Sequence, residues 1–202
     1  SSSSPGLPAI VWAHGGGIAT TAKNWDFMAS AWAKAFEAVV VNPNFRHGGD
    51  AEAPAGTMDL LATVHWVRQN AASLGVDPDH ISVMGNSGGG YEASCLGLEL
   101  AARGESQLVK AIFLDVPMIF PDEMLGPYDG WSEWRQFEYE TCFKQQYLCY
   151  AGNDPANAFE ARPPWLRVLC APDALLSKAP RHVMLSVEFD IGRWQQDLYV
   201  AK

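Results

Sequence analysis

The sequence predicts a three-layer α/β/α sandwich with a mostly parallel central sheet. Short, nearly continuous apolar segments alternate with longer segments of helical composition and spacing. Strands buried on both faces have such an apolar composition, and the helices that connect parallel strands cover those faces. The 202 residues are enough for one domain with a substantial core. We therefore expect residues 1–202 to form a single domain.

Five apolar segments are predicted to be the strands of this sheet. They cover residues 9–14, 39–44, 80–86, 108–116 and 182–189. Glycine, proline or polar residues bound them, as they commonly bound strands. Functional groups in parallel sheets gather at the carboxyl ends of the strands. The loops that follow these segments are therefore where we expect a site.

Helices are predicted between the strands, with one exception to the alternation. The helical segments are 23–38, 56–75, 88–104 and 192–202. The stretch Asp-Pro-Asp-His at 77–80 is expected to be a turn. Segment 117–165 is rich in proline, glycine and aromatic residues, with a helix predicted at 131–150. We expect it to form a cap-like excursion over one end of the sheet, with most of its aromatic residues packed onto the sheet.

The composition excludes several classes of function. The net charge of −9 repels phosphate backbones, which argues against nucleic-acid binding. The sequence has no apolar run long enough to span a bilayer. Its four cysteines include no CxxC pair and no Cys/His cluster with zinc spacing. The sequence therefore predicts neither a metal site nor a transmembrane segment.

Ser87 stands in a Gly-x-Ser-x-Gly motif between a predicted strand and a predicted helix. In a nucleophile elbow, the residues two before and two after the serine crowd each other, and glycine at 85 and 89 relieves that clash. Such a turn strains the serine backbone and exposes the hydroxyl. The helix behind it points its positive end at the site. We therefore predict that Ser87 is a nucleophile; the alternative is a glycine turn with an incidental serine.

A second glycine-rich motif, His14-Gly15-Gly16-Gly17, follows the first predicted strand. Glycines let the backbone approach an anion and direct N–H groups at it. With the Gly88 N–H just after the serine, this loop would form an oxyanion hole. Gly16, Gly17 and Gly88 are the expected donors, with Gly15 next to them, and His14 is expected to orient the loop. Alone, the motif would be equally compatible with any flexible loop.

Asp190 ends the last predicted strand, in the stretch SVEFDIGR. An aspartate in this position would orient a catalytic imidazole and stabilise its charged form. The alternative is an aspartate of a surface loop, or one that caps the helix that follows. Spacing alone does not separate these two interpretations.

The order of these motifs resembles the hormone-sensitive-lipase-like branch of the α/β-hydrolases. HGGG comes first, then the serine motif, then the stretch EFD around Asp190. The resemblance runs from about residue 8 to the end of the sequence. It implies an α/β-hydrolase fold, hydrolysis of small carboxylic esters through an acyl-serine, and no cofactor. By position, it makes Ser87 the nucleophile, Asp190 the acid, and the four glycines named above the oxyanion hole.

The sequence departs from that family most clearly at the base. Asn86 and Gly88 replace the Asp and Ala that commonly flank the serine. In the family, the catalytic histidine follows the acid by a few tens of residues. Here twelve residues follow Asp190 and none is histidine. The family's first strands are also missing, so we expect a sequence shortened at both ends relative to the family.

None of the five histidines is a clear replacement for that base. His14 belongs to the predicted oxyanion loop, and His65 lies within a predicted helix. His80 and His182 begin strands, at the end of the sheet away from the expected site. His47 follows a strand end and would lie near the site, but we interpret it as a polar loop residue.

Three functions therefore remain open from the sequence. The preferred one is a carboxylester hydrolase whose base is missing from this chain, so that the chain alone is inactive. The second is a non-catalytic hydrolase-fold subunit that binds a ligand or supports an assembly. The third is a related acyl-serine enzyme such as a peptidase or a formamidase, although HGGG favours small esters. In each case, unpaired sheet edges are expected to recruit a protein partner or a second copy.

Overall fold

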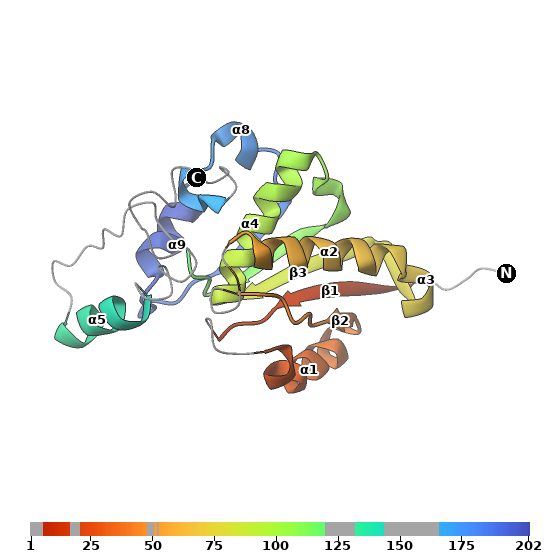
Figure 1. Ribbon diagram of the computed structural model, residues 1–202, viewed down its shortest axis with the longest axis horizontal. Helices are drawn as coiled ribbons and strands as arrows, with labels where there is room; N and C mark the ends of the chain where they lie inside the picture. The colour runs from red at the N-terminus through yellow and green to blue at the C-terminus, as the bar shows by residue number, and fades with distance from the viewer. Residues whose placement is uncertain (1–5, 17–20, 48–50, 52, 120–131, 144–165) are drawn as a thin grey trace.

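A five-stranded parallel sheet forms the centre of the molecule (Figure 1). The computed structural model describes residues 6–16, 21–47, 51, 53–119, 132–143 and 166–202. The strands are β1 (Leu7–Ala13), β2 (Val39–Val41), β3 (Val76–Asn86), β4 (Ala111–Asp115) and β5 (Arg181–Leu185). Their order is β2-β1-β3-β4-β5, and every neighbouring pair is parallel. The predicted parallel sheet of an α/β fold is thus confirmed.

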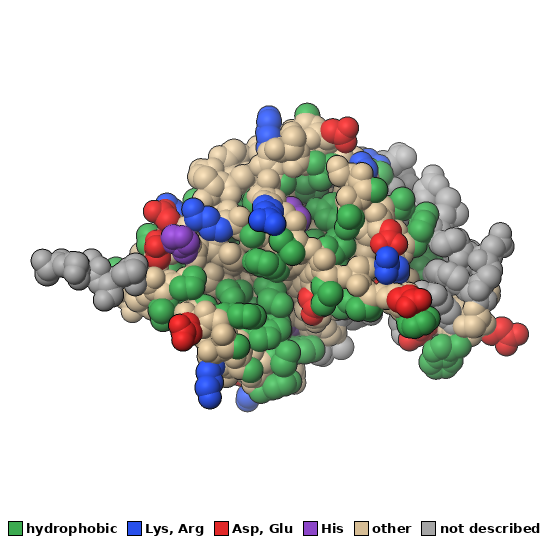
Figure 2. Space-filling view, turned by 180° about the vertical axis from the view of Figure 1, so that it is seen from behind, with side chains coloured by type: hydrophobic (Ala, Val, Ile, Leu, Met, Phe, Trp, Pro, Cys, Tyr) green, Lys and Arg blue, Asp and Glu red, His purple; other side chains and the backbone are tan. Residues whose placement is uncertain are grey.

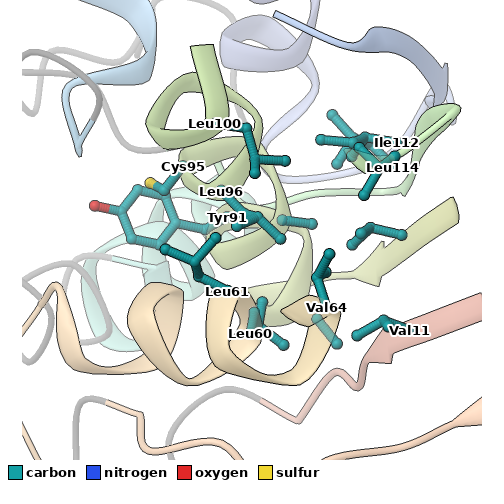
Figure 3. Close-up of a cluster of buried hydrophobic side chains, with 14 of the residues drawn as sticks. Val11, Leu60, Leu61, Val64, Tyr91, Cys95, Leu96, Leu100, Ile112 and Leu114 are labelled. Atoms are coloured by element: carbon teal, nitrogen blue, oxygen red, sulfur yellow. The ribbon is translucent and has the colours of Figure 1, made fainter. Parts of the chain in front are cut away.

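Helices lie on both faces of this sheet. α2 (Ala55–Gln69) and α4 (Gly88–Arg103) cover one face (Figure 1). α1 (Asp26–Phe36) lies on the other, where the ring of Trp32 packs 4.2 Å from the ring of Trp12 on β1. Because successive strand residues face opposite sides, the neighbouring Val11 turns toward α2. Figure 3 shows Val11 with Leu60 and Val64 of α2 in the main hydrophobic core.

The remaining elements are short. They are η1 (Ala22–Trp25), α3 (Ala71–Leu74), η2 (Ser106–Leu108), α5 (Glu133–Glu138), the π-helical turn η3 (Tyr139–Phe143), η5 (Val168–Cys170), α8 (Asp173–Leu176) and α9 (Arg193–Val200). Within the described part of the chain, no helix is both long and apolar enough to cross a membrane.

Three local predictions were wrong. β5 ends at Leu185, so Asp190 does not end a strand as expected but lies in the connection that follows. Long-range pairing or side-chain chemistry explains the other two. The expected turn at 77–80 lies inside β3, because β1 pairs with β3 on both sides of it and the register shifts between the two pairs. The single helix expected over 56–75 is two helices that meet at Asn70. The Trp66 carbonyl accepts both the Asn70 backbone N–H at 3.0 Å and the Asn70 side chain at 2.8 Å, a local side-chain bond of the kind that favours helix ends.

The predicted cap-like excursion is only partly within the described residues. Residues 120–131 and 144–165 lie outside them, and α5 with η3 represents the helix expected at 131–150. The aromatic side chains of α5 and η3 differ in burial. Tyr139 is buried, as expected for packing, whereas Trp134 and Phe137 are exposed.

Part of the sheet face opposite α2 and α4 is apolar and exposed. Phe113 on β4 is 42% exposed, and Val183 and Leu185 on the edge strand β5 are 37% and 57% exposed. With Met84 of β3 they line a shallow hollow of about 450 Å³. Figure 2 views the molecule from this side and shows hydrophobic side chains gathered across it.

We expect this apolar face to make the chain self-associate. Exposed apolar patches on sheets recruit partners, so Leu185→Lys should shift the chain toward monomer in sedimentation velocity at micromolar concentration. Val200→Lys serves as the matched control, because Val200 is 67% exposed at the end of α9. A wild-type chain that sediments as one monomeric species would contradict this expectation.

Candidate active site

Ser87 occupies a strained turn between β3 and α4. Its φ of 51° and ψ of −119° match the first central position of a type II′ turn, which glycine dominates. Backbone hydrogen bonds hold it there. Its N–H donates to the Asp115 carbonyl at 3.0 Å, and its carbonyl accepts from the Met118 N–H at 2.9 Å. A strained residue persists only where its surroundings determine it in this way.

The glycines of the serine motif are required by close packing. A Cβ on Gly85 would lie 2.5 Å from the Gly89 carbonyl oxygen and 2.6 Å from the Ala93 Cβ. A Cβ on Gly89 would collide with the Ala13 carbonyl at the end of β1. The crowding expected two residues before and after the serine is therefore present. Gly89 has a second role, because it lets the loop after β1 pass directly over the start of α4.

The second glycine motif lies beside the serine turn. Gly15 is buried, and a Cβ there would collide with the Asn86 side-chain oxygen. Gly16 has a φ of 106°, in the region that favours glycine. Gly88 is buried in the first turn of α4, directly after Ser87. The structure thus places Gly15 against Asn86 and Gly88 directly after Ser87, while Gly17 lies outside the described residues.

His14 is tied to its own loop. It is 2% exposed, and its Nδ1 lies 2.9 Å from the Gly15 carbonyl oxygen. A carbonyl only accepts, so Nδ1 carries the proton of the neutral ring. Burial lowers the pKa of His14, and the nearby His47 contributes in the same direction. A neutral ring that hydrogen-bonds within the loop agrees with an orienting role.

Asp190 lies in the turn between β5 and α9. Its Oδ1 accepts from the Gly192 N–H at 2.7 Å and from the Gln196 Nε2 at 3.1 Å. The first of these bonds is local to the turn before α9, whose N-cap residue is Gly192, so Asp190 does not itself cap the helix. The second joins the carboxylate to a buried side chain that sequence reasoning did not single out. No sequence signal marks Gln196, because one of its partners, the Pro117 carbonyl, lies 79 positions away along the chain.

Three of the other histidines bind groups on elements away from the serine turn. His65 on α2 lies 3.5 Å from the Glu105 carboxylate, and His80 lies 2.6 Å from the Asp77 carboxylate. The Nδ1 of His182 lies 2.8 Å from the Pro180 carbonyl oxygen. His47 is buried in the loop after β2, with its ring centroid 6.2 Å from that of Phe45.

A buried carboxyl group, Glu92, lies one turn beyond the serine on α4 and was also missed. It is 1% exposed, and its Oε2 accepts from the Thr57 hydroxyl at 2.5 Å. Burial raises the pKa of Glu92 to about 7, and the negative charge of Asp59 adds to the shift, while the Thr57 hydrogen bonds oppose it. The group links α4, the helix that follows Ser87, to the first turn of α2.

Strain is also present in the loop after β4. Val116 has a φ of 39°, which is a genuine outlier for a β-branched residue. Its N–H donates to the Leu185 carbonyl at 2.9 Å. Val116 stands between Asp115 and Met118, the two residues whose backbone groups hold Ser87. Strained residues cluster at functional sites, and here Val116 lies between the two residues that bond the backbone of Ser87.

Comparison with known proteins gives the site its context. A family model described as alpha/beta hydrolase fold matches residues 10–202. Carboxylesterase NlhH of Mycobacterium tuberculosis is 41% identical over 85 residues, which cover 42% of this chain and 27% of that protein. Carboxylesterase 3 of Homo sapiens is 37% identical over 108 residues, which cover 49% of this chain and 19% of that protein.

Solved structures match nearly the whole chain. An esterase of Pyrobaculum calidifontis superposes with a TM-score of 0.78 at 26% identity, covering 98% of this chain and 63% of that one. Brefeldin A esterase, described as a bacterial homologue of human hormone sensitive lipase, has a TM-score of 0.78 at 24% identity and shows the shared fold. It covers all of this chain and 58% of that one. The chain thus spans less than two thirds of each of these relatives.

We expect the strain at Ser87 to be measurable as stability. Ser87→Gly should raise the free energy of unfolding by about 1 kcal/mol, because glycine adopts this backbone conformation without strain. Ser87→Ala removes the same hydroxyl but keeps the strain, so its stability should match the wild type. Urea unfolding of the three proteins measures both effects. Equal stabilities for the Gly and Ala variants would contradict the account.

Glu92 should make stability depend on pH. The pKa of Glu92 rises from 4.5 to about 7 on folding. The folded chain therefore binds more protons between these values, and the contribution of Glu92 to stability falls as the pH rises through this window. Glu92→Gln should match the wild type near pH 4.5 and exceed it by up to about 3 kcal/mol above pH 7. Chemical unfolding across this range tests it, and a less stable Gln variant above pH 7 would contradict it.

Proposed function

Because the chain belongs to the α/β-hydrolase family, as its resemblance to the hormone-sensitive-lipase-like branch predicted, we propose that it carries the site of a carboxylester hydrolase. The observation that carries this proposal is the strained turn at Ser87, with φ of 51°, at the junction of β3 and α4. A serine in that geometry presents its hydroxyl above the sheet edge. The carboxylesterase relatives support a small acyl ester as the substrate.

The proposed reaction has two stages. The Ser87 Oγ attacks the ester carbonyl carbon as its proton passes to an imidazole. The resulting oxyanion accepts hydrogen bonds from the backbone N–H groups of Gly16, Gly17 and Gly88. The imidazole then gives its proton to the departing alcohol, which leaves an acyl-serine. Water attacks the acyl group in the same manner, releasing the acid and restoring the serine hydroxyl.

Asp190 is proposed to hold and charge-stabilise that imidazole, which we assign to none of the five histidines in the sequence. His14, His65, His80 and His182 each bind another group, and we retain the interpretation of His47 as a loop residue. A serine without its base keeps only the contributions of the oxyanion hole and of substrate binding. We therefore expect negligible ester turnover by the 202-residue chain alone.

One observation favours a second candidate function, a non-catalytic binding or structural subunit. The Asp190 carboxylate bonds Gly192 and Gln196 of its own segment, at 2.7 and 3.1 Å. Such bonds stabilise the connection between β5 and α9 whether or not Asp190 takes part in catalysis. The two functions differ in the reactivity of Ser87, because only a nucleophile needs an exposed hydroxyl beside backbone N–H donors.

A fluorophosphonate probe distinguishes these functions. We expect it to label Ser87 of the wild-type chain, as located by peptide mass spectrometry, and to leave Ser87→Ala unlabelled. Added imidazole should accelerate labelling, because it supplies the base. An unlabelled Ser87 under these conditions would eliminate the hydrolase proposal. Ordinary esterase rates on p-nitrophenyl acetate without imidazole would show that the base had been misassigned, and His47→Ala would test the nearest candidate.

A further inference from the structure

Gln196 is a fully buried amide that bonds two segments, the loop after β4 and the connection between β5 and α9. It is 0% exposed on α9. Its Nε2 donates to the Pro117 carbonyl at 3.0 Å and to the Asp190 Oδ1 at 3.1 Å, and its Oε1 accepts from the Ser186 hydroxyl at 2.6 Å. A buried amide is costly unless it is bonded in this way. These bonds fix the side chain in one orientation.

The Pro117 bond connects Gln196 to the nucleophile. Pro117 is followed by Met118, whose N–H donates to the Ser87 carbonyl at 2.9 Å. Pro117 also packs against the turn itself, since a Cβ on Gly90 would lie 2.6 Å from the Pro117 Cβ. Residues 115–118 therefore bond the backbone of Ser87 through Asp115 and Met118, and they bond the Gln196 side chain through the Pro117 carbonyl. A chain of hydrogen bonds thus connects Asp190 to Ser87 through the Gln196 side chain and this loop.

We infer that Gln196 is a positioning residue that sets Asp190 relative to Ser87, an inference that rests on the proposed function. Misplacement of a catalytic group by about 1 Å costs on the order of a hundredfold in rate, so a fixed acid matters. An amide donor suits this role because it carries no charge. The carboxylate therefore keeps its full negative charge for an imidazolium.

The neighbouring residue provides an internal contrast. Gln195 is also buried, at 1% exposed, yet neither of its amide atoms has a hydrogen-bond partner in the described structure. The two glutamines share size, polarity and helix. They differ in that only Gln196 is bonded to the loop and the acid. Gln195 is therefore a matched control for the loss of a buried glutamine from α9.

The test measures inactivation of the full chain by the fluorophosphonate at saturating imidazole. We expect Gln196→Leu to lower the maximal inactivation rate, kinact, about tenfold, as loss of a hydrogen bond to a charged group would. The half-saturating probe concentration, KI, should stay unchanged, because Gln196 does not touch the probe. Gln195→Leu should leave both constants unchanged. If Gln196→Leu and Gln195→Leu have the same kinact, the inference is overturned.

Gln196→Glu covers the case in which the leucine variant does not fold. Glutamate keeps the size of the side chain and the acceptor for Ser186. When protonated it retains one donor, whereas its ionised form repels Asp190. We expect kinact of this variant to fall relative to the wild type as the pH rises, and to recover when the pH is lowered again. An unchanged pH profile would overturn the inference.

The same experiment distinguishes a wrong proposed function from a wrong role for Gln196. A wild-type chain that is never labelled at Ser87 eliminates the hydrolase site, and the positioning role with it. A wild-type chain that is labelled, together with Gln196 variants that behave like the Gln195 control, eliminates the positioning role alone.

Discussion

The backbone of Ser87 is the constraint on which the rest of the site depends. Its N–H bonds Asp115, the last residue of β4, and its carbonyl bonds Met118 in the loop that follows. Those two bonds hold a non-glycine residue at a φ of 51°. They require β3 and β4 to end side by side, which the parallel register from Val83 with Ile112 to Asn86 with Asp115 provides. The turn also requires glycine where the loop after β1 lies against it, at Gly15 and Gly89.

Buried polar side chains hydrogen-bond the helices around Ser87 to neighbouring elements. Glu92 fixes α4 to the start of α2, and Gln196 fixes α9 to the loop after β4. Both side chains are almost inaccessible to water, and each bonds polar groups of the protein. Glu92 does so with a raised pKa and Gln196 as a neutral amide. The helices behind the site are therefore placed by specific hydrogen bonds as well as by the apolar core.

Sequence reasoning predicted the parts of the site that depend on local chemistry. The sheet, the serine motif and the glycine loop could be found because strands, tight turns and close approaches select their residue types locally. Gln196 and Val116 could not be found from the sequence, because each bonds a residue that is distant along the chain. Gln196 bonds Pro117, which is 79 positions away. The start of β3 was missed for the same reason, since it depends on pairing with Leu7.

The central claim is that this turn and the loop after β1 together form an oxyanion hole. A crystal structure of the chain after reaction with a phosphonate tests that claim most directly. The account predicts phosphorus bonded to the Ser87 Oγ, and a phosphonyl oxygen within hydrogen-bond distance of the N–H groups of Gly88 and Gly16. An adduct on another residue, or a phosphonyl oxygen turned away from both N–H groups, would contradict it.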